Sequence, residues 1–177
     1  MASAGDAENA VAEPTPPLQP VLEPLRGLLG TWRGEGNGSY PTIEPFRYLE
    51  EVRFWHVGKP FLGYEQRTRD ASTRLPSHTE SGFWRVVPDA DRDADAPTPI
   101  EMVLAHPSGL TEVSAGELAG RRLTLSSLTI ARTPTAKEVT AVERRFVLDD
   151  DVLSYEVLMA AVGQPLQLHL TASLQRV

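Results

Sequence analysis

From Thr31 onward, polar and apolar residues alternate in short segments rich in Val, Thr, Tyr and Phe. A period of two is typical of β-strands, and turn-forming Gly, Pro and Asp residues separate the segments at several points. No helix-length pattern interrupts this series. The pattern predicts ten strands, at 31–37, 46–56, 61–69, 79–87, 100–106, 110–117, 121–130, 138–148, 152–161 and 166–176.

Strands at hairpin spacing favour one antiparallel sheet, and closing such a sheet removes its exposed edges. Before the strands, apolar side chains recur at spacings of three and four residues, which predicts one short helix. They are Leu18, Val21, Leu22, Leu25 and Leu28. We therefore expect an all-β fold, an up-and-down antiparallel β-barrel of about ten strands with a short N-terminal helix. A β-sandwich is the alternative.

Two segments differ from this pattern. Residues 1–17 are dominated by Ala, Pro and acidic residues, which bury too little apolar surface to offset the entropy of ordering. We expect a disordered tail there and one domain over residues 18–177. Residues 88–99 are acidic and bracketed by prolines, which predicts a flexible hairpin loop.

The composition excludes several classes of function. The 177 residues include 24 acidic and 17 basic ones, and the formal net charge of −7 repels phosphate backbones, so we expect no nucleic-acid partner. The sequence contains no cysteine, which excludes disulfides, a cysteine nucleophile and thiolate-held metal centres. No apolar run is long enough to span a membrane and no secretory signal is visible. We therefore expect no membrane partner and a cytoplasmic location.

Four histidines are the first candidates for chemistry: His56, His78, His106 and His169. No two lie at the spacing of a local zinc motif, and His106 stands in a turn sequence, where we expect a structural role. On the last strand, alternating leucines form one face and His169 lies on the other. Simple alternation turns His169 toward solvent, whereas a barrel with a ligand cavity permits polar side chains in its lumen. The sequence leaves both orientations open.

The first strand carries a glycine motif, with Gly30, Trp32, Gly34 and Gly36 on one face. Glycines at that spacing let a strand bend or let another group come close, which indicates barrel closure rather than chemistry. A Gly-x-Trp after a short helix resembles the lipocalin and fatty-acid-binding-protein superfamily. The longer G-x-W-x-G-x-G pattern is similar to the signature of nitrobindins, which are ferric haem proteins with a ten-stranded antiparallel barrel.

Further stretches resemble nitrobindins, and actinobacterial members most of all, from about residue 18 to the C-terminus. They include Tyr-Pro-Thr-Ile at 40–43, His-Thr-Glu-Ser-Gly-Phe at 78–83, Pro-Thr-Ala-Lys-Glu-Val at 134–139 and Gln-Pro-Leu-Gln-x-His-Leu at 164–170. Several ordered motifs over most of the chain make the resemblance specific.

The resemblance implies a set of site residues. His169 matches the axial ligand of the haem iron and is the implied catalytic residue. Thr42 and Lys137 match positions of haem contacts, where a lysine cation pairs well with a haem propionate. Met159 and His78 match positions that line the haem pocket, and neither is implied as a second strong iron ligand. An imidazole ligand suits a chain without cysteine.

The resemblance also implies a function. The expected protein holds ferric haem b, binds nitric oxide and isomerises peroxynitrite to nitrate, which scavenges reactive nitrogen species. One alternative is a nitric oxide sensor or carrier without a catalytic role, and another is a carrier of an apolar ligand like the fatty-acid-binding proteins. From the sequence itself, leucine faces exposed on a closed barrel favour a homodimer.

Overall fold

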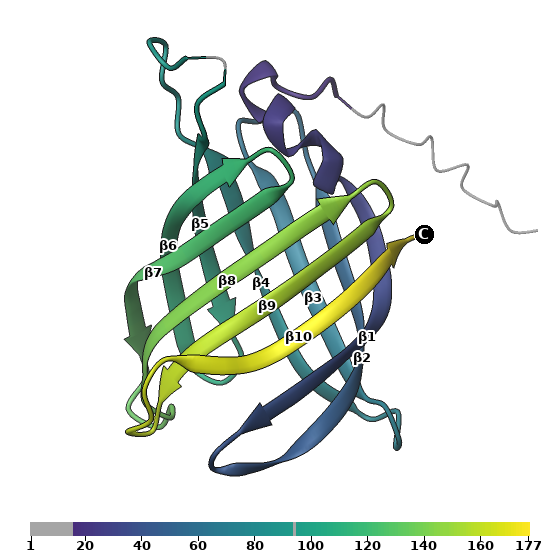
Figure 1. Ribbon diagram of the computed structural model, residues 1–177, viewed down its shortest axis with the longest axis vertical. Coiled ribbons are helices and arrows are strands. Elements are labelled where there is room, and N and C mark those ends of the chain that lie inside the picture. The colour runs from purple at the N-terminus through teal and green to yellow at the C-terminus, as the bar shows by residue number, and fades with distance from the viewer. Residues whose placement is uncertain (1–15, 94) are drawn as a thin grey trace, which may run out of the picture.

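The computed structural model describes residues 16–93 and 95–177. Ten strands form one closed antiparallel barrel, in which each strand pairs with its neighbours in sequence and β1 also pairs with β10 (Figure 1). The predicted barrel is confirmed and the sandwich is excluded, while residues 1–15 of the predicted tail lie outside the described residues. The strands are β1 (Gly30–Tyr40), β2 (Ile43–Trp55), β3 (Leu62–Asp70), β4 (Pro76–Val86), β5 (Thr98–His106), β6 (Leu110–Ala119), β7 (Arg122–Arg132), β8 (Val139–Asp149), β9 (Val152–Ala161) and β10 (Gln167–Arg176).

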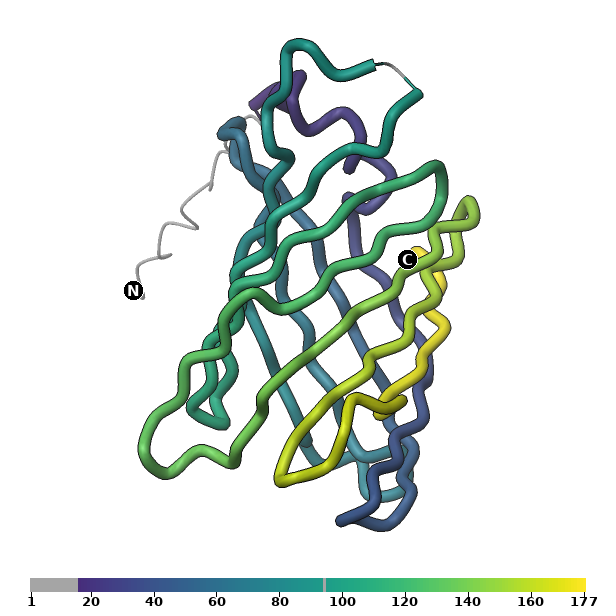
Figure 2. Tube along the Cα trace, turned by 60° about the vertical axis from the view of Figure 1, so that its left-hand side comes forward, coloured from purple at the N-terminus to yellow at the C-terminus, as the bar shows by residue number. Residues whose placement is uncertain are grey.

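The up-and-down order divides the connections between two ends of the barrel. The turns that follow the odd-numbered strands meet at the lower end in Figure 1, and those that follow the even-numbered strands meet at the upper end. The upper end also carries the N-terminal helix and the β4–β5 connection, which contains most of the predicted acidic loop (Figure 2). In the described part of the chain, no helix is long and apolar enough to cross a membrane.

The predicted N-terminal helix is a 3-10 helix, η1 (Pro20–Leu28). A 3-10 helix has three residues per turn, so Leu22, Leu25 and Leu28 share one face, and all three are buried. Pro24, inside the helix, lacks the backbone N–H that a longer α-helical ladder would use. The leucine face closes the upper end of the barrel.

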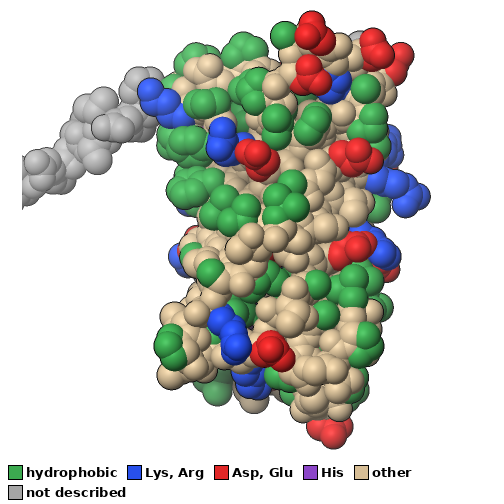
Figure 3. All heavy atoms as spheres, turned by 90° about the vertical axis from the view of Figure 1, so that its left-hand side faces the viewer, with side chains coloured by type: hydrophobic (Ala, Val, Ile, Leu, Met, Phe, Trp, Pro, Cys, Tyr) green, Lys and Arg blue, Asp and Glu red, His purple; other side chains and the backbone are tan. Residues whose placement is uncertain are grey.

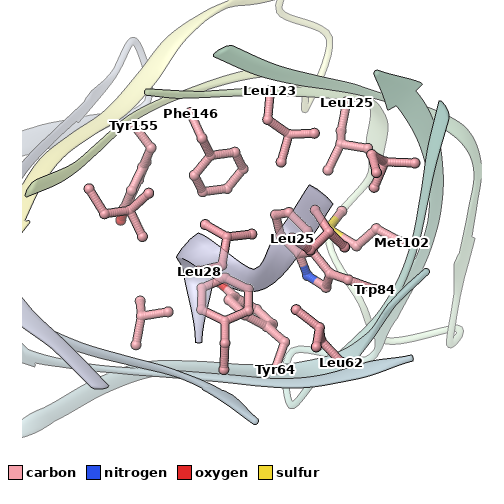
Figure 4. Close-up of a cluster of buried hydrophobic side chains, with 14 of the residues drawn as sticks. Leu25, Leu28, Leu62, Tyr64, Trp84, Met102, Leu123, Leu125, Phe146 and Tyr155 are labelled. Atoms are coloured by element: carbon pink, nitrogen blue, oxygen red, sulfur yellow. The ribbon is translucent and has the colours of Figure 1, made fainter. Parts of the chain in front are cut away.

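The upper half of the lumen is filled with apolar and aromatic side chains. Trp84 packs edge-on against Phe54, with ring centroids 5.2 Å apart, and belongs to one buried cluster with Met102 and with Leu25 and Leu28 of η1 (Figure 4). Trp32 is fully buried, and its indole Nε1 donates a hydrogen bond of 2.8 Å to the Leu28 carbonyl. This hydrogen bond ties the start of β1 to the helix that closes the barrel.

The glycines of β1 make room for close approaches. A Cβ on Gly34 would collide with the Ser173 carbonyl of β10, and a Cβ on Gly36 would collide with the Tyr48 ring of β2. The motif therefore allows β1 to approach β10 closely and allows an aromatic ring to lie across β1. This geometry agrees with a role in barrel closure.

Candidate functional site

The lower half of the lumen contains a cavity of about 270 Å³. Apolar side chains such as Ile130, Val139 and Leu170 line part of its wall, and charged and polar side chains line the rest. A second hollow of about 480 Å³, between β1, β2 and β10, shares Phe46, His169 and Leu170 with this cavity. His169 therefore lies in the wall between two spaces.

A β-bulge sets the orientation of His169. The pairing of β10 with β9 shifts register between Leu168 and Leu170, which leaves His169 as the extra residue. Beyond the bulge, Leu170 lines the cavity and Leu174 is fully buried, whereas Leu168 before it is 49% exposed. The single leucine face that strict alternation predicts is therefore wrong, and the bulge places the imidazole at the lumen.

The backbone of β1 holds one side of the His169 imidazole, and no described residue forms a hydrogen bond with the other side. Its Nδ1 lies 3.0 Å from the Ser39 carbonyl oxygen, and its ring packs edge-on against Tyr40, with centroids 5.3 Å apart. A carbonyl partner requires the proton on Nδ1, which leaves the lone pair of Nε2 for a metal. Burial lowers the pKa of His169 below its usual range, although the hydrogen bond to Ser39 acts in the opposite direction. The neutral, ligand-competent imidazole is favoured.

The structure brings together some of the expected haem contacts and leaves others apart. Met159 of β9 and His78 of β4 line the same cavity as His169. Thr42 lies in the β1–β2 turn and Lys137 in the β7–β8 loop, where both are exposed and neither lines the cavity. Both loops belong to the lower end of the barrel, at which the cavity is located (Figure 1).

Sequence reasoning missed a layer of buried charge at the floor of the cavity. Arg144 of β8 donates hydrogen bonds to Glu112 of β6 at 2.8 Å and to Glu80 of β4 at 3.3 Å. All three side chains are more than 90% buried. We refer to Glu80, Glu112 and Arg144 as the charged floor. A charged residue at an inward position of a strand, such as Arg144 between Val142 and Phe146, was the available signal.

The charges of this floor do not cancel among themselves. Arg144 holds the pKa of both Glu80 and Glu112 at about 2 against the effect of burial, so both are ionised at neutral pH. His106, which we expected to be structural, lies beside both carboxylates, with Nδ1 3.3 Å from Glu80 and Nε2 3.8 Å from Glu112. Two carboxylates thus share one guanidinium.

A buried carboxyl group with a raised pKa lies next to this floor. Glu50 is 4% exposed and accepts hydrogen bonds from Gln66 and from the Tyr155 hydroxyl, the latter at 2.7 Å. Burial raises its pKa to about 7 despite these donors. Its neighbour Glu51 points outward and pairs with Arg33. As the alternation of a strand predicts, the two carboxylates lie on opposite faces of the barrel wall.

Residues 21–176 match the family described as the THAP4-like, heme-binding beta-barrel domain. This chain belongs to that family. Known relatives include peroxynitrite isomerase 2 of Mycobacterium avium, 53% identical over 163 residues that cover 90% of this chain and 96% of that protein. Peroxynitrite isomerase 1 of Mycobacterium tuberculosis is 50% identical over 166 residues with the same coverage.

A solved structure agrees with the family. The crystal structure of Rv2717c from M. tuberculosis resembles this chain with a TM-score of 0.80 and 48% identity, over 91% of this chain and 99% of that one. The cavity and its surroundings fit the haem that the family binds. His169 offers an oriented imidazole nitrogen, and the apolar side chains around it suit a porphyrin face. In a chain without cysteine, a neutral imidazole is a well-established ligand for haem iron.

Proposed function

We propose that this chain is a peroxynitrite isomerase that holds ferric haem b through Nε2 of His169. The main observation in support is the orientation of the His169 imidazole. Its Nδ1 is bound to Ser39 within a heme-binding barrel, and its Nε2 is free. The relatives named peroxynitrite isomerases, at 50–53% identity over 90% of this chain, support the reaction.

Ferric haem b, when bound, supplies the iron at which peroxynitrite rearranges to nitrate and at which nitric oxide also binds. The rearrangement conserves atoms and electrons, so the chain needs no second substrate and no reductant. Its own residues have three tasks. The Ser39 carbonyl orients His169, the Tyr40 and Phe46 rings restrict the imidazole by edge-on packing, and Met159 and His78 shape the cavity. We further propose that Thr42 and the Lys137 cation contact the haem edge from the lower loops.

One competing function meets a physical obstacle. A carrier of fatty acids needs a free cation in its lumen for the ligand carboxylate. Arg144 is the buried arginine that lines this cavity, and its Nη2 already donates to Glu112 and Glu80, while its Nε has no hydrogen-bond partner among the described residues. A ligand carboxylate would therefore have to compete with two protein carboxylates for one guanidinium. A nitric oxide carrier uses the same residues as the isomerase and differs from it only in turnover.

Stopped-flow decay of peroxynitrite tests the proposal. We expect the haem-loaded chain to accelerate the decay in proportion to its concentration and to raise the yield of nitrate over nitrite. His169→Ala, given the same haemin, should show only the rate of free haemin. His56→Ala, which changes a histidine in the β2–β3 loop at the other end of the barrel, is the matched control. Haem binding without acceleration would instead establish a nitric oxide carrier.

We also propose a homodimer, on a surface other than the leucine face of β10. Phe83, Val103 and Val113 are opposite one another in register on β4, β5 and β6, and each is more than 40% exposed. Leu128, at a bulge of β7, extends this outward apolar row. The side of the barrel with β5–β7 exposes many hydrophobic side chains between charged pairs (Figure 3).

Sedimentation tests the homodimer. We expect about twice the 19.4 kDa chain mass for the unchanged protein. Val103→Asp should yield monomers, because a charge within the apolar row opposes its burial. Leu75→Asp, in the exposed β3–β4 turn, should leave the mass unchanged. A monomeric unchanged chain would contradict the proposal.

A further inference from the structure

Three potential metal ligands converge at one side of the cavity floor. The Oε2 atom of Glu80 lies 3.8 Å from Nε2 of His78 and 3.3 Å from Nδ1 of His106, and all three ligand atoms lie within 4.8 Å of one another. Tetrahedral zinc with bonds near 2.1 Å places its ligand atoms about 3.4 Å apart. The free side chains are therefore already close to the positions that a small divalent cation requires.

Strand geometry produces this convergence. His78 and Glu80 alternate on β4 and so face the same side, and the pairing of Ser81 with Ala105 brings the end of β5 beside Glu80. The sequence hides the group because its ligands are separated by a hairpin and only one residue pair is local. All three residues line the cavity, so positions that the protein does not fill face open space.

Two of these potential ligands have polar neighbours of the kind that orient the ligands in known metal sites. The second ring nitrogen of His106, Nε2, lies 3.8 Å from the Glu112 carboxylate, so a small shift would complete the hydrogen bond of a carboxylate–histidine–metal triad. The other oxygen of Glu80, Oε1, accepts a hydrogen bond of 2.8 Å from the Tyr64 hydroxyl. Glu80 thus has a hydrogen-bonded partner that fixes its orientation, and His106 has a carboxylate within reach of its second ring nitrogen.

The local charge favours a cation. The carboxylates of Glu80 and Glu112 both accept hydrogen bonds from the single guanidinium of Arg144, so acidic groups outnumber this cation at the floor. Arg144 lies near the same Glu80 oxygen and opposes a cation there. Its shorter hydrogen bond goes to Glu112, so it keeps a partner when a cation occupies Glu80 Oε2.

We propose that His78, Glu80 and His106 form a binding site for a divalent transition-metal ion, separate from the haem ligand His169. Two imidazoles and one carboxylate with open positions suit zinc or ferrous iron. A bound ion would reverse the sign of the charge at the floor and attract anions into the cavity. The site uses other ligands than the haem iron does, although His78 lines the cavity that both sites share.

Titration of the full chain with Zn²⁺ by calorimetry tests the site, with the haem-free and haem-loaded forms measured separately. We expect one Zn²⁺ per chain. In the haem-free form, we also expect bound Co²⁺ to give the intense ligand-field absorption of a four- or five-coordinate site. His78→Ala and His106→Asn should each weaken binding by more than the roughly 10-fold to 100-fold that loss of an outer partner costs. Tyr64→Phe, which removes an outer partner, should fall within that range.

Two controls separate this proposal from the haem function. His169→Ala should lose haem and still bind one Zn²⁺, and His56→Ala should retain both. The side chain of His78 is 41% exposed, so its replacement leaves the fold intact, and thermal unfolding of each variant verifies this. Absence of saturable Zn²⁺ binding, or binding that is indifferent to His78 and His106, would overturn the proposal.

Discussion

The two halves of the barrel are built from the same strands and hold different contents. The upper half is filled with apolar and aromatic side chains, and the leucine face of η1 closes it. The lower half holds a charged floor, a cavity and His169, whose Nδ1 is bound to the Ser39 carbonyl. The upper half contributes stability through apolar burial. The lower half combines buried charge, which carries a desolvation penalty, with open space, which lacks packing contacts. Both features are typical of a ligand-binding site rather than of a stabilising core.

The largest expected effects are losses in the free energy of unfolding, which we compare for one substitution in each half. Arg144→Met removes the cation from the lower half and leaves two buried carboxyl groups without it, so we expect a loss of about 3–5 kcal/mol in the free energy of unfolding. Leu25→Ala in the upper half leaves a cavity and should cost about 2–5 kcal/mol. Urea denaturation measures both.

The pH dependence distinguishes the two losses. Glu80 and Glu112 have pKa values of about 2 in the folded protein, below the value of 4.5 for a free glutamate. A lowered pKa contributes stability above the unfolded value and loses it as the pH falls toward the folded value. The deficit of Arg144→Met should therefore be largest at neutral pH and shrink in acid, whereas that of Leu25→Ala should stay constant. Parallel deficits would contradict a charged floor.

A smaller effect is expected at Glu50, whose pKa is raised to about 7 by burial. A raised carboxyl pKa contributes stability below the unfolded value of 4.5 and loses it as the pH rises toward 7. Glu50→Gln removes this titration, so its stability relative to the unchanged protein should increase by about 2–4 kcal/mol across that interval. Denaturation curves in buffers across the interval measure the increase, and a constant difference would show that Glu50 is ionised throughout.

The smallest effect tests the bulge at His169. Leu168 points outward before the bulge, so Leu168→Ala should change the free energy of unfolding by less than about 0.5 kcal/mol. Leu174, beyond the bulge, is fully buried, and Leu174→Ala should cost about 2–5 kcal/mol. Equal costs would mean that strict alternation holds along β10.

The sequence predicted the upper half better than the lower half, for physical reasons. Alternation, turn residues and the leucines of η1 depend on local periodicity, and the predicted helix and strands follow from it. The orientation of His169 depends on one extra residue in the β9–β10 pairing, which no period reveals. The partnership of Glu80, Glu112 and Arg144 joins three strands that are distant in sequence, so it becomes visible only when the barrel closes.

A haemin titration followed by Soret absorption tests whether Nε2 of His169 is the axial ligand of the haem iron. The unchanged chain and His56→Ala should each bind one haemin with the same saturable Soret shift. His169→Ala should lose that shift while its thermal unfolding stays close to that of the unchanged chain, because the imidazole is only partly buried. A Soret shift that survives His169→Ala would contradict the account.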